Sequence, residues 1–259
     1  MIDWDDAFDN SGYVPGAAAM LERWTAQARA VRVEAGELDI AYGPGARNRL
    51  DLFRPEGTVR GLAVFVHGGY WHMLDKNVWS HFATGCLPRG WALAVPGYTL
   101  APEMRIGEIV REIAAAVSFA AELVPGPVRL IGHSAGGHLV SRMACEGGPV
   151  PGRLERVVSV SGIHDLRPLL GTRMNEILQL DTAEAEAESP ALRRPRDGLD
   201  VRFWCGACER PELLRQTRLI SEAWAAPNTF EPDHDHFTII EGLGDPGSPL
   251  TEAFLGAPD

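Results

Sequence analysis

A serine flanked by glycines follows one of the apolar runs of this chain, in the sequence Gly132-His133-Ser134-Ala135-Gly136-Gly137. The run before it spans Val128 to Ile131, and a helical pattern begins directly after the serine. A G-x-S-x-G segment between a strand and a helix forms a sharp turn that exposes the serine hydroxyl beside a base. The helix that follows also adds positive potential where negative charge develops. We therefore predict that Ser134 is a nucleophile that attacks a small acyl or formyl carbonyl.

Attack on a carbonyl produces an oxyanion, which is stabilised by N–H donors that are already in position. Each donor lowers the activation barrier by about 3 kcal/mol. One donor is the amide after the nucleophile, which is that of Ala135, and another comes from a loop after an earlier strand. Gly68 and Gly69 follow the run 61–66. We expect these three residues to form an oxyanion hole. Three neighbouring residues are candidates for substrate binding: Tyr70, Trp71 and His133. Tyr70 and Trp71 could equally be core aromatics.

The base should be a histidine late in the chain, because the expected order for this motif is nucleophile, acid, histidine. His234 and His236 satisfy that order. We choose His236, because the apolar run that follows, from Phe237 to Ile240, can anchor it against the core, and we expect His234 at the surface.

The acid should follow the next-to-last strand and face the histidine, so that it orients the imidazole and stabilises the imidazolium. Val201 to Trp204 is that strand, and Glu209 lies in the loop after it. Glu212, one turn further on, fits the first turn of a helix better. Glu209 is therefore our candidate acid.

The elements around these residues alternate between short β-branched runs and longer segments of helical period. This pattern predicts a mostly parallel sheet with helices on both faces. The expected strands are 37–42, 50–54, 61–66, 91–95, 128–131, 157–161, 201–204 and 229–231. The expected helices are 77–88, 103–123, 135–146, 212–224 and 250–255. The first two strands, separated by Gly43-Pro44-Gly45, could form an antiparallel hairpin at one edge.

We expect one domain over residues 1–259, with two segments outside the alternation. Residues 1–33 form an N-terminal arm, helical over 17–31, that could pack on the sheet or cover a site. Residues 164–197 are an irregular excursion with helical composition around 182–188, and they could be a solvated insertion or a cap over the site.

Composition limits the partners of the chain. The net charge is −11, and no run of Lys and Arg could follow nucleic-acid phosphates. No apolar run reaches the ~20 residues that cross a bilayer. The acidic start lacks the features of a secretory signal, so we expect a cytoplasmic protein. We expect a small-molecule substrate and no cofactor or metal, and a homodimer is compatible with the sequence.

A pair of cysteines in Trp204-Cys205-Gly206-Ala207-Cys208 looks like the W-C-G-x-C of thioredoxins. In those proteins a helix begins at the first cysteine and stabilises its thiolate. Here Pro211 predicts a later helix start, since proline favours the first turn. We therefore favour a buried or turn cysteine pair over redox chemistry.

Several motifs together resemble the kynurenine formamidase (arylformamidase) group of α/β-hydrolases. They are H-G-G-Y-W at His67, G-H-S-A-G-G-H-L at Gly132, S-G-I-H-D-L-R-P-L at Ser161, M-N-E-I-L-Q-L at Met174, R-P-E-L-L-R-Q at Arg210 and D-H-F at Asp235. The resemblance covers nearly all of the chain after about Gly61. It implies the α/β-hydrolase fold and hydrolysis of N-formyl-L-kynurenine to kynurenine and formate, a step of tryptophan catabolism, through a formyl-serine intermediate.

Carried onto this sequence, the resemblance implies a triad of Ser134, His236 and an acid in the loop before Pro211. Members of the group usually have aspartate where this sequence has Glu209. Two other functions fit the same residues. One is a carboxylesterase or thioesterase acting on short acyl esters, and the other is a binding protein that keeps the fold without catalysis.

Overall fold

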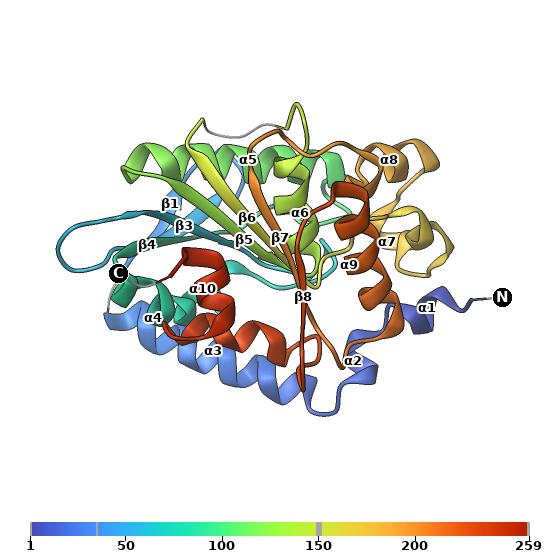
Figure 1. The fold of residues 1–259 in the computed structure, drawn as a ribbon, viewed down its shortest axis with the longest axis horizontal. Coiled ribbons are helices and arrows are strands. Elements are labelled where there is room, and N and C mark those ends of the chain that lie inside the picture. The colour runs from blue at the N-terminus through green and yellow to red at the C-terminus, as the bar shows by residue number, and fades with distance from the viewer. Residues whose placement is uncertain (1, 35, 149–151, 258–259) are drawn as a thin grey trace.

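The computed structural model describes residues 2–34, 36–148 and 152–257. Its centre is one sheet of eight strands in the order β1-β2-β4-β3-β5-β6-β7-β8 (Figure 1). The strands are β1 Glu37–Ala41, β2 Arg49–Phe53, β3 Gly61–Val66, β4 Trp91–Pro96, β5 Val128–His133, β6 Leu154–Val160, β7 Asp200–Gly206 and β8 Asn228–Glu231. Each expected strand is present, and its ends agree with the prediction to within three residues.

The sheet is antiparallel at one edge and parallel elsewhere. β1 and β2 form the expected antiparallel hairpin, and β2 also pairs antiparallel with β4. The pairs from β4 through β3 to β8 are all parallel. The carboxyl ends of six neighbouring strands therefore meet at one edge of the sheet, where ligands bind in open α/β sheets.

Both faces of the sheet are buried, and strand β3 shows why. Its side chains alternate between the two faces, with Leu62, Val64 and Val66 in one apolar cluster and Ala63 and Phe65 in the other. All are inaccessible to solvent. An apolar residue at every position is the pattern of a parallel strand covered by helices on both sides.

The longer helices cover both faces of the sheet (Figure 1). The α-helices are α1 Trp4–Ala7, α2 Asn10–Tyr13, α3 Ala17–Glu34, α4 Ala83–Cys86, α5 Ile106–Leu123, α6 Ala135–Ala144, α7 Asn175–Leu178, α8 Thr182–Ala187, α9 Pro211–Trp224 and α10 Pro249–Leu255. The 3-10 turns are η1 Lys76–Val78, η2 Ser80–Phe82, η3 Leu87–Arg89, η4 Arg167–Gly171, η5 Pro190–Leu192 and η6 Thr238–Gly244. Helices α5, α6 and α9 lie over one face, and α3, α4 and α10 lie over the other.

The expected continuous helix from Asn77 to Pro88 is wrong. The segment is broken into 3-10 turns and the single helical turn α4, and Trp79 leaves the helical conformation with φ −117° and ψ 0°. Trp79 and Phe82 are both buried against Phe65, at ring centroid distances of 5.4 and 4.9 Å. A spacing of three residues matches a 3-10 turn, so packing of these rings overrides the helical pattern.

The N-terminal arm packs against the face that carries α4 and α10. In Figure 1 the helix α3 runs along the bottom of the molecule beneath α4 and α10. Trp24 of α3 is buried, with its ring centroid 5.4 Å from that of Trp79. Near the end of the helix, Arg32 forms an ion pair with the fully buried Asp51 of β2. Of the two expectations for this arm, packing on the sheet is therefore confirmed.

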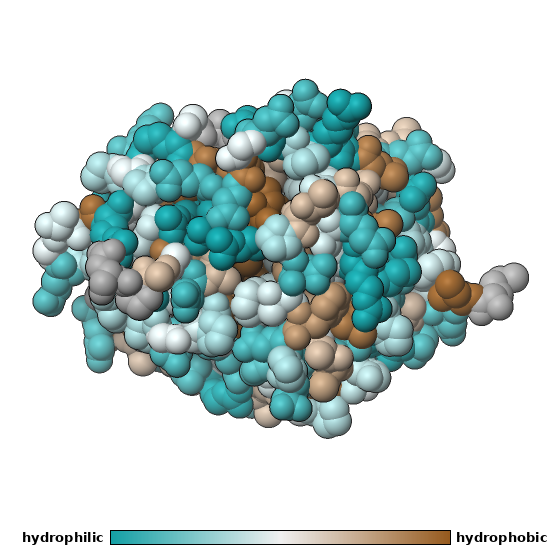
Figure 2. All heavy atoms as spheres, in the orientation of Figure 1, coloured by the Kyte–Doolittle hydropathy of each residue, from teal (hydrophilic) through white to brown (hydrophobic). Residues whose placement is uncertain are grey.

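The face of the molecule shown in Figure 2 is mostly hydrophilic. Teal and white residues cover most of the face seen in Figure 2, with brown residues showing between them. Scattered apolar side chains of this kind are normal for a folded surface. None of the helices in the described part of the chain is both long and apolar enough to cross a membrane.

Candidate active site

Ser134 lies at the turn between β5 and α6, in a conformation that few residues adopt. Its φ is +57° and its ψ is −119°. The flanking glycines make the turn feasible: a Cβ on Gly132 would lie 2.1 Å from the Gly136 carbonyl oxygen, and one on Gly136 would lie 2.0 Å from that of Val66. Strained backbone of this kind is concentrated at functional sites. The turn brings Ser134 into the lining of a pocket.

The loop after β3 lies directly against this turn. A Cβ on Gly68 would be 2.9 Å from the Ser134 Cβ and 3.6 Å from the Ala135 nitrogen. The Ala135 amide is the first of helix α6, so it has no acceptor within the helix. Gly69 continues the loop with φ +99°. The structure thus brings the three predicted oxyanion-hole residues together around Ser134.

The two aromatics that follow these glycines point in different directions. Tyr70 and Trp71 both have positive φ, +49° and +60°. Tyr70 lines the pocket. Trp71 is fully buried and donates from Nε1 to His138 Nδ1 at 3.2 Å, and it is not among the described pocket-lining residues. The structure therefore does not bring Trp71 to the pocket, because its side chain packs in the core against His138.

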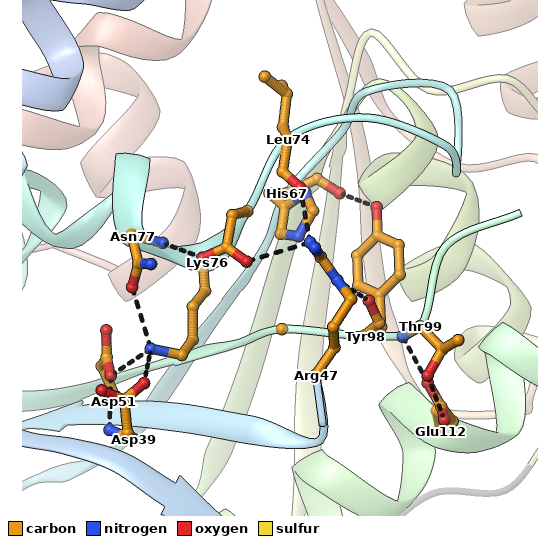
Figure 3. A network of polar contacts seen from close by, with 12 residues as sticks. Asp39, Arg47, Asp51, His67, Leu74, Lys76, Asn77, Tyr98, Thr99 and Glu112 are labelled. Atoms are coloured by element: carbon orange, nitrogen blue, oxygen red, sulfur yellow. Dashed lines mark hydrogen bonds and ion pairs between the residues drawn. The ribbon is translucent and has the colours of Figure 1, made fainter. Parts of the chain in front are cut away.

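Buried polar contacts support the same loop from behind (Figure 3). Tyr98 donates from its hydroxyl to the carbonyl oxygens of His67 at 3.0 Å and Gly68 at 3.3 Å. The ring of His67 stacks on that of Tyr98 at 4.4 Å and donates from Nδ1 to the Gly68 oxygen at 2.7 Å. Burial lowers the pKa of His67 to about 4, so its ring is neutral. These contacts keep the carbonyl oxygens of His67 and Gly68 pointing toward Tyr98.

Arg47 extends this support to the chain beyond the glycines. Its guanidinium donates to the carbonyl oxygens of Leu74 at 2.6 Å and Tyr98 at 2.9 Å, and it pairs with Asp75 at 3.1 Å. Figure 3 shows Arg47 reaching between these groups. Because Leu74 lines the pocket, Arg47 ties one pocket wall to the strand end that carries Tyr98.

His236 and Glu209 form a buried pair. The His236 Nδ1 lies 2.8 Å from the Glu209 Oε2, and both side chains are at most 5% exposed. Glu209 also accepts hydrogen bonds at Oε1 from the Ser161 hydroxyl and from the Gly206 amide at 3.0 Å. Burial opposes ionisation of Glu209, but the His236 ring and these hydrogen bonds outweigh it and lower the pKa of the carboxyl. An ionised carboxylate only accepts, so the proton sits on Nδ1 of His236 and its Nε2 is free to accept another.

The loops that carry this pair are fastened to each other. Cys208 donates from its amide to the His234 oxygen at 2.9 Å. A Cβ on Gly206 would lie only 2.3 Å from the same oxygen, so this close approach requires glycine. Asp235 caps the turn by accepting from the amides of Phe237 and Thr238, each at 2.9 Å. His234 itself is 36% exposed, which agrees with the expected surface position.

His133 makes a hydrogen bond to the loop that carries His236. Its Nε2 donates to the His236 carbonyl oxygen at 2.8 Å, and the two rings are 4.7 Å apart. Burial, and then the neighbouring His236, lower the pKa of His133 to about 3. The ring is therefore neutral, and it connects the turn of Ser134 to the loop of His236. It also lines the pocket, as expected for a substrate contact.

Sequence reasoning did not identify Ser161 or Gly206 as parts of the site. Ser161 follows the end of β6 with φ +52° and donates to Glu209. Gly206 donates its amide to the same carboxylate. A serine and a glycine at neighbouring strand ends were the available signal, because carboxyl ends of parallel strands meet at one edge of the sheet.

A pocket of about 470 Å³ connects the two halves of the site, because it is lined by both Ser134 and His236. Its lining is Asn10, Ser11, Val14, Gly16, Ala17, Ala18, Leu21, Trp24, Gly69, Tyr70, Met73, Leu74, Trp79, His133, Ser134, His236 and Phe237. The N-terminal arm supplies eight of these residues, so it also covers the site. No residue of 164–197 is among them; that segment is instead joined to α6, where His138 donates to the Glu188 oxygen at 2.7 Å.

The cysteine pair lies beside the site but lacks the features of a redox centre. Cys205 is buried, Cys208 is exposed, and both are free thiols. Burial, followed by the charge of Glu209, raises the pKa of the Cys205 thiol. Helix α9 begins at Pro211, as predicted, and so gives Cys205 no helix N-terminus. Among the described residues, no group of three or more His, Cys, Asp or Glu side chains is arranged to hold a metal ion.

Comparison with known proteins gives the same class. Residues 63–254 match the model of the alpha/beta hydrolase family. Kynurenine formamidase of Danio rerio is 26% identical, covering 97% of this chain and 91% of that protein, and the enzyme of Salmo salar is 28% identical, covering 84% and 80%. A crystal structure of a thioesterase candidate from Silicibacter sp. tm1040 has a TM-score of 0.95 at 45% identity, covering 98% of this chain and 99% of that one. The chain is therefore a hydrolase enzyme that belongs to the alpha/beta hydrolase family.

Proposed function

We propose that the chain is a serine hydrolase that removes a formyl group from an aryl amide, with Ser134, His236 and Glu209 as its catalytic triad. The observation that carries this proposal is the buried pair of His236 and Glu209, in which His236 lines the same pocket as Ser134. The reference substrate is N-formyl-L-kynurenine, which would give kynurenine and formate.

In the first half of the reaction, the free Nε2 of His236 accepts the proton of the Ser134 hydroxyl as the oxygen attacks the formyl carbon. Glu209 keeps the proton on Nδ1 and stabilises the imidazolium that forms. The developing oxyanion is stabilised by backbone amides from Gly68, Gly69 and Ala135, which act where charge appears in the transition state.

His236 then gives its proton to the nitrogen of the leaving arylamine, and the C–N bond breaks to leave a formyl-serine. In the second half the same imidazole takes a proton from water, which attacks the formyl-serine and releases formate. The imidazole returns this proton to the Ser134 oxygen as its bond to the formyl carbon breaks, so the second half consumes one water molecule and regenerates the enzyme.

Sequence similarity favours the formamide over other acyl substrates. The curated relatives that match along most of this chain are named kynurenine formamidase. The motif from Ser161 onward, which resembles that group, also supplies the hydroxyl that contacts Glu209.

A second candidate function is a thioesterase or carboxylesterase for short acyl groups. It is favoured by the 45% identity to the thioesterase candidate, which exceeds the identity to the formamidases. Esters and thioesters use the same triad and oxyanion hole, so the pocket decides between these substrates. A binding protein without catalysis is disfavoured, because it would not need an ionised carboxylate on His236.

One experiment separates the formamidase from the esterase function. It compares kcat/KM for N-formyl-L-kynurenine with kcat/KM for p-nitrophenyl acetate and p-nitrophenyl butyrate. Ser134→Ala is the blank for all three. We expect the formamide to have the highest kcat/KM. A clear preference for the butyrate would make the chain a general esterase.

The other sequence-based expectations stay predictions. We propose that the protein works in the cytoplasm on a small molecule, without nucleic acid, and that it forms a homodimer. Fractionation and sedimentation of the native protein test the location and the assembly.

A further inference from the structure

Most residues that line the pocket beside Ser134 carry no formal charge. None of the described residues that line it is Asp, Glu, Lys or Arg. The titratable groups in the lining are the imidazoles of His133 and His236 and the phenol of Tyr70. His133 is kept neutral because burial and the neighbouring His236 lower its pKa to about 3. Apart from the triad histidine, the wall offers a ligand no ionic partner.

Most of the wall is apolar, and much of it comes from the N-terminal arm. The arm contributes the side chains of Val14, Ala17, Ala18, Leu21 and Trp24. Burying a charged group against such a surface costs several kcal/mol unless it is paired. A substrate that carries an ammonium and a carboxylate, such as an α-amino acid, would therefore have to keep both outside this pocket.

Among the described residues, two buried polar atoms of lining side chains have no hydrogen-bond partner: the donor Nε1 of Trp79 and the acceptor Oδ1 of Asn10. The side chain of Asn10 is buried and donates from Nδ2 to the Tyr70 hydroxyl at 2.8 Å, whereas its Oδ1 is buried and makes no hydrogen bond in the structure. The orientation of this amide is fixed by its neighbour. Tyr70 donates its only hydroxyl proton to the Phe8 carbonyl oxygen, so it can only accept from Asn10.

A buried acceptor without a partner is costly, and in a ligand pocket such an atom fixes the orientation of what binds. The amide lies at the start of α2, where the arm closes over the site. Its Oδ1 can accept a hydrogen bond from an N–H of a substrate that fills the pocket.

We propose that the pocket binds an uncharged aromatic part of an aryl formamide and that Asn10 determines specificity by accepting a hydrogen bond from its N–H. This proposal rests on the function proposed above and narrows its substrate class. N-formyl-L-kynurenine then binds less well than a neutral aryl formamide, because its ammonium and carboxylate find no ionic partner in this wall.

The first test compares two substrates that differ in the presence of the ammonium and carboxylate groups. 2-Formamidobutyrophenone has the ring, ketone and chain length of N-formyl-L-kynurenine without its ammonium and carboxylate. We expect kcat/KM for the neutral compound to exceed that for N-formyl-L-kynurenine. An equal or higher value for N-formyl-L-kynurenine would overturn the neutral pocket.

A binding measurement keeps this test separate from the proposed reaction. The affinities of 2-aminobutyrophenone and kynurenine for the Ser134→Ala protein are measured by calorimetry. The neutral amine should bind more tightly even if neither formamide is hydrolysed, in which case only the formamidase assignment fails. Tighter binding of kynurenine would reject the neutral pocket whatever the enzyme hydrolyses.

The second test addresses Asn10 with a matched control. Asn10→Ala should lower kcat/KM for the neutral formamide by about three- to tenfold more than for p-nitrophenyl acetate, which has no N–H to donate. Ser11→Ala changes the neighbouring residue of the same pocket wall and leaves Asn10 and Tyr70 intact, so it should change both substrates by the same factor. If Asn10→Ala also changes both substrates equally, Asn10 has only a structural role.

Discussion

The carboxylate of Glu209 lies 2.8 Å from Nδ1 of His236 and is fixed there by two further donors, the Ser161 hydroxyl and the Gly206 amide. A glutamate is one methylene longer than the aspartate usual in the group that this chain resembles. The structure accommodates the longer side chain by burying it completely and holding its other oxygen at the strand ends. Glutamate can therefore orient the imidazole as aspartate does.

Replacing Glu209 tests this arrangement. Glu209→Gln keeps the shape but removes the charge and allows the imidazole to take the other tautomer, so we expect kcat to fall by about 10³- to 10⁴-fold. Glu209→Asp keeps the charge and should retain more activity than Glu209→Gln. Steady-state kinetics on the preferred substrate measure both variants. Wild-type activity in Glu209→Gln would mean that the acid lies elsewhere.

Ser161→Ala removes one donor to the same carboxylate without touching the histidine. The loss of a hydrogen bond to a charged group is worth about 1.5 to 3 kcal/mol, so we expect kcat to fall by about ten- to a hundredfold with little change in KM. The pH dependence of kcat/KM should also shift, because Glu209 would hold the imidazolium less well. A change confined to thermal stability would show that Ser161 is only structural.

Gly206→Ala tests the close approach of the two loops. The added Cβ would meet the His234 oxygen at 2.3 Å, so the loop that carries His236 must move. We expect a loss of about 1 to 3 kcal/mol of stability and a fall in kcat. Gly152→Ala is the matched control, since a Cβ there meets no atom within 4 Å. Equal effects of the two changes on kcat would contradict this role of Gly206.

Tyr98→Phe removes the hydroxyl behind the loop of Gly68 while keeping the ring stacked on His67. The carbonyl oxygens of His67 and Gly68 would lose the donor that they share, and such a hydrogen bond contributes about 1 kcal/mol. We expect kcat to fall by about fivefold for the formamide and for p-nitrophenyl acetate alike, because both reactions use the same oxyanion. An effect on KM alone would assign Tyr98 to substrate binding instead.

The buried histidines make the protein sensitive to acid. Burial is the main cause that lowers the pKa of five histidines. The pKa falls to about 4 for His67 and His81, and to about 3 for His133, His138 and His164. Below the ordinary histidine pKa of about 6.5, the unfolded chain binds protons that the folded chain does not. The free energy of unfolding should therefore fall as the pH drops from 6.5 towards 4, by up to about 1.4 kcal/mol per pH unit for each histidine.

Urea unfolding at several pH values measures this slope. His164→Gln should make the slope shallower by up to one proton, because it removes one buried ring. His234→Gln, at a half-buried position of the surface loop, is the control. An unfolding free energy that stays constant between pH 6.5 and 5 would contradict the neutral, buried state of these rings.

The sequence predicts the sheet and the turn of Ser134 well, because their causes are local. Each β-branched run is long enough to form a strand, and the glycines around Ser134 are needed by the turn itself. The segment after Asn77 is different, since burial of Trp79 and Phe82 breaks a pattern that alone favours a helix. Local preference is overridden there by packing.

The pocket was harder to predict than the triad. Tyr70 and Trp71 are adjacent aromatics in one glycine-containing loop, and both have positive φ. Which of them reaches the pocket depends on contacts with distant residues, such as that of Trp71 with His138. The sequence also gives no indication of which surface the N-terminal arm covers, because that depends on contacts between distant residues. Asn10, which we now propose as a specificity residue, carries no motif around it.

The central claim is that Ser134 is a nucleophile activated by His236, and covalent labelling tests it most directly. The folded protein is treated with a fluorophosphonate, and the adduct is located by mass spectrometry of its peptides. We predict one adduct, on Ser134, with labelling much slower in His236→Ala and absent in Ser134→Ala. A folded wild-type protein that takes no label at Ser134, or that labels as fast without His236, would contradict this account.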